Sequence, residues 1–153
     1  MCETKKIKPN PIQQICMKSK IFISAFIISI GSLFLSSFIQ NPLAASIARG
    51  KKVYDKVCLS CHMVDGGGVP HLNPPLAQSS YVLGDKKRII TIVLKGMTDR
   101  IAIDDEYYSN NMAPHNDLTD QQIADVLTYI RNSFGNKASA VTVNEVKAVR
   151  NKK

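Results

Sequence analysis

The segment Cys58-Leu59-Ser60-Cys61-His62 places two thiols and an imidazole within five consecutive residues. This Cys-x-x-Cys-His spacing is typical of covalent haem attachment. Two thiols at this spacing can add across the two vinyl groups of one porphyrin, and the following residue presents its imidazole to the iron. The sequence therefore predicts one covalent haem c, with Cys58 and Cys61 as its attachment points and His62 as one axial iron ligand.

Three other uses of this thiol pair fit the surrounding sequence less well. A structural zinc site usually contains two such pairs, whereas only one lies here, and His71 is poorly placed to complete it. A thioredoxin-like dithiol belongs to a β-α-β pattern, but a predicted helix precedes this motif and a Gly-rich loop follows it. A structural disulfide would leave His62 unexplained.

A second axial ligand must come from elsewhere in the chain. Met63 adjoins the proximal histidine and cannot reach the opposite face of the porphyrin, and His71 lies in the loop that follows. Met112 lies in an irregular, proline-bearing stretch that can hold a thioether against that face. We expect Met112 to be the ligand, with Met97 and His115 as alternatives, although methionines more often only fill a core.

Apolar residues at three- and four-residue steps predict an all-α domain. Helices are expected over residues 43–57, 86–95 and 120–134, and a short last helix ends at Arg150. Residues 63–84 and 97–118 are predicted to be irregular, with a brief extended piece at 101–103 and no strand pairing. On the first helix, Gly50 shares a face with Tyr54, which suggests a close crossing by another element.

The N-terminal segment has the pattern of an export signal. Lysines precede an uncharged run of 19 residues, 21–39, and this run is longer than most signal-peptide cores. We expect residues 1–43 to be a basic leader, retained as a membrane anchor rather than cleaved. The haem domain, predicted over 44–136 with an extension over 137–153, would then lie on the periplasmic or extracytoplasmic side.

The charge distribution limits the kinds of partner. The formal net charge is +8, and five lysines of the first 20 residues contribute much of it. The remaining chain has no concentrated basic stripe of the kind that binds nucleic acid. A mildly basic surface suits an acidic redox protein partner or an anionic membrane surface.

The order of several motifs resembles that of the class I single-haem cytochromes c. After Gly50 and Tyr54 come the Cys58–His62 motif, Gly66-Gly67-Gly68, Pro74-Pro75-Leu76, Met112, and finally Val126-Leu127-Thr128-Tyr129-Ile130-Arg131. The stretch 118–136 is similar to the small cytochrome c domains that accompany quinoprotein dehydrogenases or copper nitrite reductases.

This resemblance implies further roles for particular residues. It implies about four helices around one haem, with Gly50 and Tyr54 at the crossing of the first and last helices. It assigns Pro74 as the residue whose carbonyl accepts a hydrogen bond from the ring of His62, and Leu76 as a residue that presses on the haem. It also favours Met112 over Met97 as the distal ligand.

These observations predict one-electron transfer by a carrier, or by the electron-transfer subunit of a respiratory or dehydrogenase chain, and not an enzyme. An iron held by His62 and Met112 has no open position for a substrate, and a thioether ligand raises the reduction potential. The alternative is a haem-based gas sensor or a small peroxidase with a displaceable sixth ligand.

Overall fold

A computed structural model describes residues 41–98 and 100–152 of the 153-residue chain. The leader predicted over 1–43, with its apolar run, lies almost entirely outside the described residues. In sequence order the elements are α2 (Pro42–Val57), α3 (Leu59–His62), α4 (Ser80–Leu83), α5 (Lys86–Lys95), β1 (Ile101–Ile103), β2 (Glu106–Tyr108), α6 (Asp120–Arg131) and α7 (Val143–Arg150). No helix within these two described ranges is both long and apolar enough to span a membrane.

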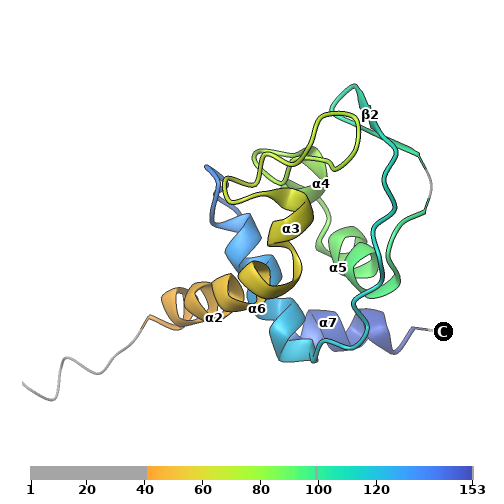
Figure 1. The fold of residues 1–153 in the computed structure, drawn as a ribbon. Helices are drawn as coiled ribbons and strands as arrows, with labels where there is room; N and C mark the ends of the chain where they lie inside the picture. Colours follow the sequence, from red (N-terminus) through yellow and green to blue (C-terminus); the bar gives the residue numbers. More distant parts are fainter. Residues whose placement is uncertain (1–40, 99, 153) are drawn as a thin grey trace, which may run out of the picture. The chain divides into compact units, whose positions relative to one another are not determined.

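The centre of the fold is a close crossing of α2 and α6 (Figure 1). A Cβ atom on Gly50 would lie 2.0 Å from the backbone oxygen of Asp125 and 2.7 Å from the Cβ of Tyr129. Only a glycine permits so close an approach without displacing one helix. The crossing predicted at Gly50 is therefore confirmed.

Aromatic rings surround this crossing. The Tyr54 ring lies 5.3 Å from that of Tyr129 and 5.4 Å from that of Phe134, measured between centroids. The Tyr54 hydroxyl donates a hydrogen bond of 2.6 Å to the carbonyl oxygen of Met63, just after the Cys-x-x-Cys-His segment. Burial raises the pKa of Tyr54 well above its usual value, so the hydroxyl keeps its proton. The crossing is thereby connected directly to that segment.

A buried carboxylate also joins the two helices. Asp125 of α6 is only 2% exposed and accepts hydrogen bonds from Ser46 and Arg49 of α2, at 2.6 to 2.8 Å, and from Gln121 at 3.0 Å. Burial opposes its ionisation, but the hydrogen bonds from Arg49, Ser46 and Gln121 together outweigh burial and lower the pKa. Asp125 is therefore ionised at neutral pH.

The helices begin where their capping residues predict. Asp85 caps α5 by accepting from two backbone amides, and Gly96 ends that helix as expected. Thr119 with Gln122, and Thr142 with Glu145, form complete capping boxes at the starts of α6 and α7. The C-terminal extension joins the same core, because Val141 and Val146 are buried there.

The third predicted helix is shorter than expected. We predicted helix to residue 134, but α6 ends at Arg131 with Asn132 as its C-cap. Phe134 has a φ of 57°, which a helix cannot accommodate, and its ring packs on Tyr54 and Tyr129. The helix therefore ends before Phe134, and the Phe134 ring packs against the two tyrosines at the crossing.

Two irregular regions contain more structure than predicted. The one-turn helix α4 lies within the region 63–84 that we expected to be loop. The expectation of no strand pairing was wrong, because β1 and β2 form an antiparallel hairpin. Asp104 and Asp105, both with positive φ, make its two-residue turn, and this dipeptide lacks the glycine that usually signals such a turn.

Two buried polar side chains fasten the loops to α6. Asn136 donates to the carbonyl oxygens of Leu76 (2.9 Å) and Ile130 (2.8 Å) and accepts from the amide of Gln78 (2.7 Å). Arg131, 3% exposed, donates to the carbonyl oxygens at the end of α4 and to that of Ser139. The bonds of Asn136 hold the segment around Leu76 against α6, and those of Arg131 hold the end of α4 against the same helix.

Candidate functional site

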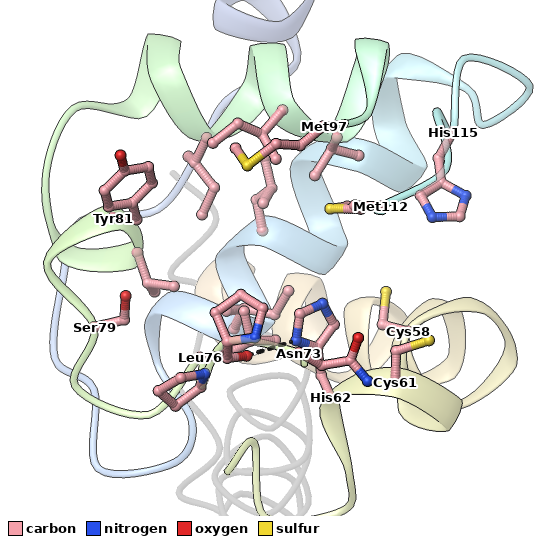
Figure 2. A pocket seen from close by; sticks show the side chains of 18 of the residues that line it. Cys58, Cys61, His62, Asn73, Leu76, Ser79, Tyr81, Met97, Met112 and His115 are labelled. Carbon is pink, nitrogen blue, oxygen red and sulfur yellow. Dashed lines mark hydrogen bonds between the residues drawn. The ribbon is translucent and has the colours of Figure 1, made fainter. Parts of the chain in front are cut away.

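The two thiols and the imidazole are presented by a single turn of helix. α2 ends at Val57, Cys58 serves as the N-cap of α3, and the amides of Cys61 and His62 both donate to the Cys58 carbonyl oxygen. Residues three apart on a helix share one side, so both sulfurs lie beside the His62 ring (Figure 2). Both cysteines are free thiols, with Cys58 half-buried and Cys61 exposed.

These side chains line one large cavity, of about 350 Å³. Most of its surface is apolar and comes from α5, α6, the loop after α3 and the segment that precedes α6. The main apolar contributors are Val57, Leu76, Val82, Ile89, Val93, Ile103, Leu118, Val126, Leu127 and Ile130. An apolar cavity with a few converging polar groups is the usual form of a cofactor site.

The His62 ring is oriented by a backbone carbonyl. Its Nδ1 lies 3.0 Å from the carbonyl oxygen of Pro74, and since that oxygen can only accept, Nδ1 carries the hydrogen. Nε2 is then left with its lone pair available for a metal. The predicted hydrogen bond between His62 and Pro74 is thus present, and such a bond fixes the ring and strengthens it as a ligand.

Their surroundings keep the His62 imidazole and the Cys58 thiol uncharged. Burial lowers the pKa of His62; the bond to Pro74 opposes this shift, and nearby His115 adds to it. Burial, followed by the neighbouring Cys61, raises the pKa of Cys58 to about 11. Redox-active dithiols instead have a lowered thiol pKa, so Cys58 lacks the electrostatics of a thioredoxin-like thiol. Nowhere in 41–98 or 100–152 do three His, Cys, Asp or Glu side chains gather as metal ligands.

Two methionines face the His62 ring and the two thiols from across the cavity (Figure 2). The backbones of Met97 and Met112 pair with each other through hydrogen bonds of 2.9 and 2.8 Å. Gly96, with a φ of 71°, lies so close that a Cβ there would be 2.4 Å from the Met112 carbonyl oxygen. The amide of His115 donates to the Val93 carbonyl oxygen at 2.8 Å. The irregular stretch around Met112 is therefore held firmly at the end of α5.

The structure brings most of the predicted site residues together. Pro74, Leu76 and His115 line the same cavity, and the amide of Leu76 donates to the Gly66 carbonyl oxygen at 2.7 Å. His71 is exposed, lies 3.6 Å from Glu106 and does not line the cavity. Sequence reasoning missed several polar lining residues: Asn73, Ser79, Tyr81, Tyr108, Asn110 and Asn111. No spacing pattern distinguishes them from ordinary loop residues.

Comparison with known protein families identifies the family of this chain. The sequence profile of the family described as cytochrome c matches residues 47–134. The chain belongs to the cytochrome c family. The matched region begins in α2 and ends just after α6, so it includes the complete cavity and both sets of residues that face each other across it.

Similar proteins include free cytochromes and dehydrogenase subunits. Cytochrome c-552 of Thermus thermophilus is 32% identical over 128 residues, covering 78% of this chain and 86% of that protein. The cytochrome c subunit of a quinone alcohol dehydrogenase from Gluconacetobacter polyoxogenes is 36% identical over 110 residues, covering 66% of this chain. The cytochrome subunit of fructose dehydrogenase from Gluconobacter japonicus is 32% identical over 116 residues, covering 72% of this chain. This chain spans only 22% and 24% of these two subunits.

Family membership determines the cofactor and the general function. Cytochromes c bind a covalent c-type haem with its iron, and they transfer electrons without being catalysts themselves. The predictions of haem c and of haem-mediated electron transfer are therefore confirmed. The residues present also fit such a group, because a large apolar cavity has free thiols at one edge and a histidine whose Nε2 is available.

Proposed function

We propose that this cytochrome c carries one electron at a time through a haem attached at Cys58 and Cys61, with His62 and Met112 as axial ligands. The observation that supports this most directly is the arrangement of the cavity. His62 faces it from one wall with Nδ1 bonded to Pro74, and the Met112 side chain lines the opposite wall. An imidazole and a thioether on opposite walls suit a six-coordinate, low-reactivity iron.

The protein's own residues position the group and exclude competitors. When bound, the haem supplies a reversible one-electron change at iron. Pro74 holds the His62 ring in one orientation, and the Met97–Met112 backbone pair limits the movement of the Met112 sulfur. With His62 and Met112 holding the iron, gases and peroxides would find no vacant position. The apolar lining keeps bulk water away, which reduces the solvent reorganisation that accompanies electron transfer.

We also propose that the haem domain works on the extracytoplasmic side of a membrane. The lysine-rich start and the uncharged run 21–39 support residues 1–43 as an export leader, retained as an anchor, before a domain over 44–136 and an extension over 137–153. Redox protein partners are supported by relatives that are cytochrome subunits of dehydrogenases. Cell fractionation and the mass of the mature chain test this: a full-length chain in the membrane fraction agrees, and a cytoplasmic chain contradicts it.

The absorption spectrum of the holoprotein tests the ligand assignment. We expect Met112→Ala to abolish the weak far-red band of methionine-ligated ferric haem, and Met97→Ala to leave it unchanged. Met97 is a matched control because its backbone pairs with that of Met112 and its side chain lines the same cavity. The opposite pair of results would overturn the assignment.

Two further measurements separate this function from its alternatives. The reduced wild-type protein should bind carbon monoxide poorly, whereas rapid binding would indicate a gas sensor or peroxidase. The alkaline pyridine derivative, together with the protein mass, should show one haem joined through two thioethers. A colourless mature protein with no added mass would refute haem attachment at Cys58 and Cys61.

A further inference from the structure

One buried hydroxyl in the cavity wall has no hydrogen-bond partner within the described part of the chain. Ser79 is 1% exposed, and its Oγ makes no hydrogen bond with any described residue. Serine at the start of a helix usually accepts from a backbone amide two or three residues later, but Ser79 precedes α4 without making that bond. An unpaired buried hydroxyl is costly and rare in native proteins, so it indicates a partner other than the described residues.

The position of Ser79 suggests what that partner is. Ser79 lines the cavity and lies on the side remote from Cys58 and Cys61, next to Tyr81 (Figure 2). The guanidinium of Arg88 lies over the Tyr81 ring, 4.9 Å from its centroid. This side of the cavity therefore combines a hydrogen-bond donor with a nearby positive charge, which suits an anion.

A porphyrin has its two carboxylates on the half opposite its vinyl groups. If the vinyl carbons are joined to Cys58 and Cys61, as the proposed function requires, the carboxylates are directed towards the side where Ser79 lies. We propose that the Ser79 hydroxyl donates a hydrogen bond to one of these porphyrin carboxylates. A carboxylate can only accept, and a hydrogen bond to a charged acceptor is about twice as strong as one to a neutral acceptor.

Other ionisable groups around this part of the cavity have identifiable roles. Arg131 of α6 already donates to the carbonyl oxygens of Val82 and Gly84. Asp104 of the hairpin turn accepts from the backbone amide of Ser80 at 3.1 Å, and Tyr108 of β2 also lines the cavity. Tyr81 and Arg88 are further ionisable groups on this side. Among the side chains near α4, Ser79 is the one with an unused buried donor.

Resonance Raman spectra of the holoprotein test the hydrogen bond directly. The bending mode of the porphyrin propionate chains depends on hydrogen bonding to their carboxylates. We expect Ser79→Ala to shift this mode and Ser79→Thr, which retains the hydroxyl, to restore it. Ser80→Ala is the matched control because Ser80 is the next residue and is exposed. A mode that is the same in wild type, Ser79→Ala and Ser80→Ala would refute the proposal.

The pH dependence of the reduction potential provides an independent readout. A donated hydrogen bond favours the ionised carboxylate, so its loss in Ser79→Ala should move the corresponding inflection upward by about one pH unit. An inflection unchanged in Ser79→Ala would also contradict the hydrogen bond. All variants should retain covalent haem by mass, since Ser79 is not an attachment point. If even the wild type carried no haem, the proposed function itself would fail, which is a separate result.

Discussion

Replacement of Gly50 by alanine provides the sharpest test of how the helix crossing supports the haem site. The added Cβ would lie 2.0 Å from the Asp125 carbonyl oxygen and 2.7 Å from the Tyr129 Cβ. Both obstacles belong to the α6 backbone or lie directly on it, so neither can rotate away. The two helices must therefore separate, which loosens the contacts of Tyr54 with Tyr129 and Phe134.

The expected size of the effect follows from two opposing contributions. Overpacking of this kind costs up to ~3 kcal/mol, whereas alanine gains ~1 kcal/mol over glycine in a helix interior. We therefore expect Gly50→Ala to lower the free energy of unfolding by about 2 kcal/mol. For a domain of this size the melting temperature should fall by roughly 8 °C.

The assay is urea unfolding of the holoprotein, followed by far-ultraviolet circular dichroism and by haem absorbance. Coincident transitions support a two-state analysis. Gly67→Ala is the matched control, because the nearest atom to its Cβ is a carboxylate oxygen of the flexible Asp65 side chain at 3.1 Å. That variant should stay within ~0.5 kcal/mol of wild type. A Gly50→Ala protein as stable as wild type would show that this contact does not determine how closely α2 and α6 can approach each other.

Two further predictions concern the buried polar groups. Asn136→Ala removes three hydrogen bonds that hold the 76–78 loop and α6, so the free energy of unfolding should fall by about 3 kcal/mol in urea titrations. Exposed Asn144→Ala should have little effect, and equal losses in the two variants would contradict this account. Asp125 has a lowered pKa when folded, so its stabilisation is complete above its unfolded pKa of ~4 and is lost as the pH falls through the folded value. Asp125→Asn should therefore be less stable than wild type at pH 7, with the difference shrinking in acid; a pH-independent difference would rule out this ionisation.

Local signals in the sequence predicted much of this fold correctly. The capping boxes at Thr119 and Thr142, and the Asp85 and Gly96 pair, determine helix ends through bonds between residues two to four apart. The Cys58–His62 segment lies on one helical turn, so the closeness of its thiols and imidazole follows from spacing alone. Such features depend on neighbours along the chain and can be read without knowledge of the fold.

Long-range contacts were harder to predict. The early end of α6 accompanies the packing of Phe134 on rings contributed by α2 and α6, which periodicity does not report. Asp125 looks like an ordinary polar residue on a helix, yet the crossing buries it and surrounds it with donors from α2. Asn136 connects positions 58 and 60 residues away in the sequence.

The sequence by itself therefore determined the family, the grouping of two thiols and an imidazole in the Cys58–His62 segment, and the main helices, because each depends on residue type and short-range spacing. Only the tertiary structure decided that Met112 and His62 line opposite walls of one cavity, and that the Ser79 hydroxyl is buried there without a partner among residues 41–98 and 100–152. The physical reason is that burial and distance between remote segments depend on how the helices pack, and no local pattern encodes them.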